Sequence, residues 1–122
     1  MTPGDYAQAW LMHHTARFTV RYGHDLTFAG VDLPPPRTRR VPTRHGRVRV
    51  LEHGRGGPAY VHAHGGAWLM RYPQMDDWWC RYVAATAGVR VVNVDFRTGP
   101  YVAYPVAQHQ CHDVAAAVAA EA

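Results

Sequence analysis

Two adjacent glycines that follow a short apolar segment constrain this chain more than any other feature. Residues 59–64 have the character of a largely buried strand, and Gly65 and Gly66 come directly after them. Glycine adopts positive φ angles without steric cost, so a glycine pair after a strand predicts a sharp turn whose backbone can approach a ligand closely. The chain is therefore expected to pass from this strand through a loop into a helix.

A helix and a second strand are expected after the glycines. Asp76 and Asp77 stand where carboxylates favour a helix N-terminus by capping and through the helix dipole, and Gly88 is placed to end that helix. Residues 89–95 are a nearly continuous β-branched run, as in a parallel strand covered on both faces. Strand, helix and strand in this order predict a βαβ unit. The helix positions expected to share one face are Trp79, Tyr82, Val83 and Thr86.

The first part of the chain predicts a helix and a linker. Residues 3–21 fit a helix, because Pro3 suits a first helical turn. Three consecutive prolines within residues 30–36 forbid a helix and predict a linker. The expected stripe of the helix contains Tyr6, Trp10, His13 and Arg17, with Leu11 and Phe18 beside it.

Further elements are expected on either side of the βαβ unit. Residues 38–42 and 47–52 predict two short strands, and Val48 and Val50 alternate with arginines as in a strand with one wet face. A last helix begins near Val106. Its predicted apolar stripe contains Ala107, Cys111, Val114, Ala115 and Val118.

Composition narrows the class of protein. The 122 residues suit one domain, and 48% hydrophobic with 18% charged residues is typical of a globular chain. All 13 basic residues are arginine, which indicates a GC-rich coding bias. The net charge of +4 is therefore not taken as evidence for a nucleic-acid partner, and none is expected. We see no secretory signal, membrane-spanning run or disulfide framework, which predicts a cytoplasmic protein without a membrane partner.

The glycine pair lies within His64-Gly65-Gly66-Ala67-Trp68, and this HGGAW stretch resembles a family motif. Hormone-sensitive-lipase-like esterases of the α/β-hydrolase fold (alpha/beta hydrolase fold-3) have a similar His-Gly-Gly-Gly or His-Gly-Gly-Ala loop after their third strand. The resemblance continues beyond the loop. Further similar segments are Cys80-Arg81-Tyr82, residues 91–97, Tyr104-Pro105-Val106-Ala107 and Asp113.

The resemblance implies roles for the loop residues. Gly66 and Ala67 would donate the N–H groups of an oxyanion hole, which stabilises the negative oxygen of a tetrahedral intermediate. Gly65 would provide the bend, His64 would support the loop through its ring, and Trp68 would pack at the pocket edge. Two further residues would be structural, Asp95 and Arg97.

The implied fold is an α/β fold, namely an incomplete, doubly wound α/β-hydrolase sheet. It would comprise the N-terminal half of about four strands, together with an N-terminal helix. Residues 1–36 would form the N-terminal helix and the Pro-rich linker. Residues 37–122 would form the N-terminal half of the hydrolase domain, truncated before the nucleophile elbow. The substrate of the full-length parent would be a small-molecule ester, and no cofactor or metal is expected.

The catalytic triad of this family is absent from the sequence. The chain contains no serine, no Gly-x-Ser-x-Gly follows the glycine loop, and neither Cys80 nor Cys111 lies in a glycine elbow. The chain is therefore expected to be inactive as an isolated fragment, which leaves its status as an enzyme uncertain. The strand at residues 59–64 would be a bare sheet edge, and this predicts self-association.

Other readings of the same residues stay open. A formamidase or other amide hydrolase of the same fold has a similar loop, and a non-catalytic truncated product or interaction module fits the missing nucleophile. His62 and His64 share one face of a strand and suggest a metal-dependent hydrolase. His109, His112 and Asp113 have chelating spacing on the last helix, although a solvated face explains them better.

Overall fold

The computed structural model describes residues 2–19 and 33–121. The predicted end of the first helix at residue 21, and residues 30–32 of the predicted linker, lie outside the described residues. All of the predicted helices and strands are present, with boundaries within a few residues of those expected. In chain order they are α1 (Pro3–Thr19), β1 (Arg37–Thr43), β2 (Gly46–His53), β3 (Ala59–Ala63), the short 3-10 helix η1 (Pro73–Asp76), α2 (Asp77–Ala87), β4 (Arg90–Asp95) and α3 (Val106–Ala120).

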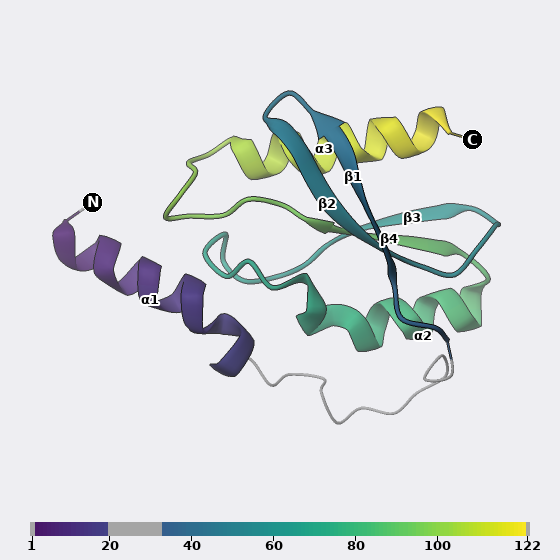
Figure 1. The fold of residues 1–122 in the computed structure, drawn as a ribbon, viewed down its shortest axis with the longest axis horizontal. Coiled ribbons are helices and arrows are strands. Elements are labelled where there is room, and N and C mark those ends of the chain that lie inside the picture. Colours follow the sequence, from purple (N-terminus) through teal and green to yellow (C-terminus); the bar gives the residue numbers. More distant parts are fainter. Residues whose placement is uncertain (1, 20–32, 122) are drawn as a thin grey trace.

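The strands form one mixed sheet in the order β1-β2-β4-β3. β1 pairs antiparallel with β2, β2 pairs antiparallel with β4, and β3 pairs parallel with β4. α2 and α3 lie on opposite sides of this sheet (Figure 1). The α/β fold class is therefore confirmed, and the predicted βαβ unit corresponds to β3, α2 and β4.

The larger core lies between the sheet and α3. Val92 and Val94 of β4 point to this side with Val50 of β2, and they pack against Val114 and Val118. Each buried valine contributes about 1.5–3 kcal/mol relative to an exposed one. The predicted stripe of α3 is correct for most positions but wrong for Ala115, which is exposed. Gln110 is buried instead, because its Oε1 accepts the backbone N–H of Arg97 at 2.8 Å.

The smaller core lies between the sheet and α2. Cys80 and Ala84 of α2 are buried against Val91 of β4, and Val83 packs beside them. The helix face predicted from the sequence is therefore wrong for Trp79, which is 37% exposed, and for Thr86, which is also exposed. The close approach of helix and sheet favours small side chains at the contact. Gly88 ends α2 at a φ of 65°, as predicted.

The side chains that α1 buries against the rest of the molecule are small. Ala9 and Ala16 are its buried side chains. Tyr6 and Trp10 of the predicted stripe are each 53% exposed, so that stripe is not a buried face. The helix lies beside the loops at one end of the sheet rather than over either face (Figure 1). Among the described residues, no helix is long and apolar enough to cross a membrane.

Candidate active site

The glycine loop leaves β3 through an unusual backbone turn. Gly66 has a φ of 134°, and Ala67 and Trp68 have φ angles of 55° and 61°. The carbonyl of Gly66 accepts the N–H groups of Leu69 and Met70, both at 3.0 Å. A Cβ atom at position 66 would lie 2.7 Å from the Met70 carbonyl oxygen, so the turn requires glycine there.

The turn leaves two amides free. Among the described residues, neither the N–H of Gly66 nor that of Ala67 has an acceptor. Ala67 and Trp68 line a hollow of about 630 Å³ whose other walls come from α1 and the loop after β4. The indole of Trp68 stays 51% exposed beside it. An unpaired N–H group at the rim of a largely apolar hollow, such as that of Ala67, can bind a developing anion.

His64 is buried where β3 ends. Its ring stacks on Phe96 with 4.5 Å between ring centroids, and its Nδ1 lies 2.5 Å from the carbonyl oxygen of Gly65. Burial lowers the pKa of this imidazole below its ordinary value, although the Gly65 carbonyl opposes the shift. His64 is therefore neutral near pH 7, and its ring lies between Phe96 and the carbonyl of Gly65.

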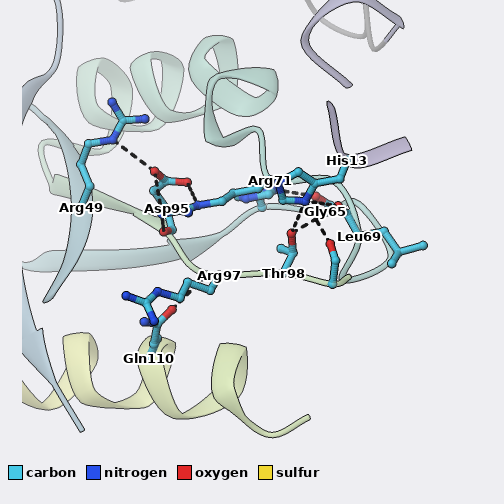
Figure 2. Close-up of polar contacts among 11 residues, drawn as sticks. His13, Arg49, Gly65, Leu69, Arg71, Asp95, Arg97, Thr98 and Gln110 are labelled. Atoms are coloured by element: carbon cyan, nitrogen blue, oxygen red, sulfur yellow. Dashed lines mark hydrogen bonds and ion pairs between the residues drawn. The ribbon is translucent and has the colours of Figure 1, made fainter. Parts of the chain in front are cut away.

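α1 and the loop after β4 hold the far side of the glycine turn (Figure 2). The Nδ1 of His13 lies 3.0 Å from the carbonyl oxygens of both Leu69 and Gly99, and Thr98 Oγ1 donates to Leu69 at 3.2 Å. The Gly99 amide also donates to the Trp68 carbonyl at 2.8 Å. No local sequence pattern signals these contacts, because they join residues that are far apart in the chain.

Asp95 forms an ionic cluster at the end of β4 (Figure 2). Arg71 Nε lies 3.0 Å from Oδ1, and Arg49 Nε lies 3.2 Å from Oδ2. The carboxylate thus joins β4 to β2 and to the segment after the glycine loop. Arg97 is exposed, and its backbone N–H donates to Gln110 Oε1, which joins the segment after β4 to α3. Arg71 had no local signal in the sequence.

The two aspartates before α2 are engaged elsewhere. Asp76 precedes the helix but makes no side-chain capping hydrogen bond. Its Oδ2 lies 2.7 Å from His62 Nε2, and Asp77 Oδ2 accepts from Arg81 Nε at 2.7 Å. The prediction of side-chain capping is therefore wrong, because both carboxylates find stronger charged or ring partners.

The histidines considered as metal ligands have other partners. His62 bonds Asp76, and no group of three or more His, Cys, Asp or Glu side chains in the described ranges is arranged to hold a metal ion. On α3, His109 Nδ1 lies 2.8 Å from His45 Nε2, and Asp113 pairs with Arg44 at 2.7 Å.

Comparison with known proteins decides the family. A profile described as the alpha/beta hydrolase fold matches residues 60–122, which include the glycine loop and α3. The chain belongs to the alpha/beta hydrolase fold family. This alpha/beta hydrolase is 31% identical to the versiconal hemiacetal acetate esterase of Dothistroma septosporum over 85% of its own length. It spans 38% of the length of that relative.

Solved structures agree with this assignment. A hyperthermophilic esterase from the archaeon Pyrobaculum calidifontis is 33% identical with a TM-score of 0.65, over 73% of this chain and 30% of that one. A thermophilic carboxylesterase cloned from a metagenomic library is 25% identical with a TM-score of 0.65, over 100% of this chain and 40% of that one. The alpha/beta hydrolase sheet described above is thus shared with esterases.

Neither cysteine of this alpha/beta hydrolase chain can replace the missing serine. Cys80 of α2 is fully buried against the sheet, and burial raises the pKa of its thiol to about 12. Burial also raises the pKa of Cys111 to about 11. Since the thiolate is the nucleophilic form, both groups are unreactive near pH 7.

Proposed function

We propose that this chain supplies the N-terminal part of a carboxylic ester hydrolase of the hormone-sensitive-lipase-like branch. The unpaired amides of Gly66 and Ala67 carry this proposal, and Ala67 also lines the apolar hollow. In it, residues 1–36 form the N-terminal helix and linker, and residues 37–122 form the N-terminal half of the hydrolase domain. The substrate class is a small-molecule ester, and the location is the cytoplasm.

The loop residues have separate roles in this proposal. Gly66 and Ala67 donate to the oxyanion of the tetrahedral intermediate, and each such donor contributes about 3–4 kcal/mol to transition-state stabilisation. Gly65 provides the bend, the buried His64 ring supports the loop, and Trp68 forms the pocket edge. The interstrand contacts of Asp95, and the backbone contact of Arg97, support structural roles for both residues.

The nucleophile is the part that must come from elsewhere. The chain has no serine and its thiols are protonated near pH 7, so it is expected to show no sustained ester turnover alone. The test is a chimera in which residues 1–122 replace the matching segment of the thermophilic carboxylesterase from the metagenomic library, which aligns with 100% of this chain. The chimera is expected to hydrolyse p-nitrophenyl butyrate.

Two glycine variants of the chimera make the test specific. Gly66→Ala places a Cβ atom against the Met70 carbonyl and displaces the loop, so kcat is expected to fall by about 10²–10³. Gly56→Ala is the matched control, because Gly56 also has positive φ but open space around its Cβ position. A folded chimera that keeps its kcat in Gly66→Ala would contradict the oxyanion role.

We also propose that the isolated chain self-associates through β3. In the described sheet, β3 is an edge strand and its residues 59–63 carry no formal charge and no proline. The opposite edge, β1, contains Arg37, Arg39, Arg40 and Pro42, which are the features that keep an edge strand unpaired. This asymmetry favours pairing at β3.

A further inference from the structure

A second polar cluster lies on β3, away from the glycine turn. Tyr60 and His62 are two residues apart and therefore lie on the same face of the strand. Tyr60 Oη lies 3.0 Å from His62 Nδ1, and His62 Nε2 lies 2.7 Å from Asp76 Oδ2. Asp76 is the last residue of η1. The fold therefore brings Tyr60 and His62 of β3 and Asp76 of η1 together in one hydrogen-bonded line.

For an ionised carboxylate and a neutral imidazole, the donors and acceptors in this line have one consistent arrangement. Asp76 accepts, so His62 Nε2 carries the hydrogen and donates it to the carboxylate. His62 Nδ1 then has a free lone pair and accepts the phenolic hydrogen of Tyr60. This is the order of orienting group, base and nucleophile found where a weak nucleophile is activated.

The phenol is the most exposed group of the cluster. The side chains of His62 and Asp76 are 13% and 14% exposed, whereas Tyr60 is 37% exposed on the edge strand. Shielding from water strengthens the hydrogen bond between imidazole and carboxylate. The nucleophile is therefore accessible to a small reagent while the two groups behind it are held in place.

We propose that Tyr60 is an acylation site for activated aryl esters, with His62 as general base and Asp76 as its positioning residue. The phenol oxygen attacks the acyl carbon while its proton passes to His62 Nδ1. The bond from the acyl carbon to the aryl oxygen breaks, and the aryl oxide leaves and recovers that proton. The products are one O-acyl-tyrosine and one free phenol, with no other reactant required.

This site does not depend on the oxyanion loop or on a serine, so it goes beyond the proposed function. It predicts one acylation per chain and not continued turnover. A burst of p-nitrophenol that stops near one equivalent would fit Tyr60, whereas sustained release at enzyme-like rates would contradict both the single acylation and the expected inactivity of the isolated chain.

Two other tyrosines serve as internal controls. Tyr101 Oη contacts His14 Nε2, but among the described residues no carboxylate bonds the other nitrogen of that ring. Tyr104 has no hydrogen-bond partner in the same ranges and is 84% exposed. Exposure alone would make Tyr104 react fastest, since Tyr101 is 59% and Tyr60 37% exposed. The proposal predicts the reverse order of acylation rates, because His62 and Asp76 activate Tyr60.

The experiment treats the folded chain with p-nitrophenyl acetate near neutral pH and follows acetylation by tryptic peptide mass spectrometry. Tyr60 is the one tyrosine between Arg55 and Arg71, so its peptide is diagnostic. Tyr60 is expected to acetylate at least about tenfold faster than Tyr104, because a positioned base contributes about 10²–10⁴-fold to such a step. Equal or faster acetylation of Tyr104 would overturn the proposal.

Variants then test each member of the cluster. His62→Asn is expected to reduce Tyr60 acetylation to the rate of Tyr104, and Asp76→Asn to reduce it by an intermediate factor. His14→Asn, the matched control, should change Tyr101 and leave Tyr60 unaffected. A folded His62→Asn chain with an unchanged Tyr60 rate would overturn the proposal. If His62→Asn does not fold, Asp76→Asn and the ratio of Tyr60 to Tyr104 in the unaltered chain decide it.

Discussion

The Nδ1 atom of His13 lies 3.0 Å from the carbonyl oxygen of Leu69, so a helix near the start of the chain is bonded to the turn after the paired glycines. The same nitrogen lies 3.0 Å from the Gly99 carbonyl oxygen. Carbonyl oxygens only accept, so Nδ1 carries the hydrogen. Because Ala9 and Ala16 are the buried residues of α1, this ring is a main attachment of the helix.

His13→Ala should therefore release α1 without unfolding the sheet. Loss of a hydrogen bond of about 1–1.5 kcal/mol corresponds to roughly tenfold more frequent opening of the helix. Limited trypsin digestion should cleave after Arg17 about tenfold faster, while cleavage after arginines of the sheet is unchanged. Gln8→Ala, an exposed position on the same helix, is the control. Equal cleavage of the His13→Ala and unaltered chains would show that other contacts hold α1.

The Asp95 cluster predicts a large stability loss from a nearly isosteric change. Asp95→Asn keeps the shape but removes the charge that Arg49 and Arg71 share, and the side chain of Asp95 is only 8% exposed. The free energy of unfolding should fall by about 2–3 kcal/mol, measured by urea titration. Asp113→Asn breaks the Arg44 pair at the surface and should cost clearly less. Similar losses in both variants would mean that burial does not govern these ion pairs.

Two neighbouring glycines provide a matched test of packing. Gly56 and Gly57 have φ angles of 71° and 70°, so alanine meets the same backbone strain at either position. A Cβ atom at Gly56 meets nothing within 4 Å, whereas at Gly57 it would overlap the carbonyl oxygen of Gly88. Gly56→Ala should cost about 1–2 kcal/mol of unfolding free energy, and Gly57→Ala about 1–3 kcal/mol more. Thermal melts that place both variants at the same Tm would refute the close approach of this turn to the end of α2.

Two buried histidines predict sensitivity to mild acid. Burial lowers the pKa of both His53 and His64, and the Asp77 carboxylate only partly opposes this for His53. In the unfolded chain both rings titrate near their ordinary value of about 6.5. Below that pH the unfolded state binds protons that the folded state does not, so stability should fall as pH decreases from about 6.5. Urea midpoints measured across this range should show a weaker pH dependence in His64→Gln than in the unaltered chain. An unchanged pH dependence in a folded His64→Gln chain would contradict this assignment.

The edge asymmetry predicts different effects of the same charge at the two sides of the sheet. Ala59→Lys places a charge on exposed β3, whereas Thr38→Lys places it on exposed β1, which already carries arginines. If β3 is the associating edge, sedimentation should show that Ala59→Lys shifts the chain towards monomer. Thr38→Lys should leave the distribution as it is. A monomeric unaltered chain at the same concentration would contradict the self-association proposal.

Local sequence was sufficient for the outline of the fold. β4 lies within the β-branched run at residues 89–95, and Gly88 ends the preceding helix as expected. The strand before the glycine loop also lies where its apolar residues and flanking turns place it, but the expectation that it is largely buried is wrong, because it is an edge strand whose residues 59–63 are exposed or half-buried. These features depend on side-chain shape, strand period and backbone freedom, which act between neighbours in the chain.

Tertiary structure decided which helix faces are buried and which polar groups meet. The sequence favoured Trp79 for the shared face of α2, but close packing on the sheet takes Cys80 and Ala84 instead. The bonds from Asp76 to His62 and from His13 to Leu69 join distant segments, so no local pattern could signal them. The sequence alone determined the order of elements and the turn at the glycines. The partners of α1 and of the buried polar groups followed only when the sheet brought remote residues within hydrogen-bond distance, because those interactions depend on the position of both groups in space.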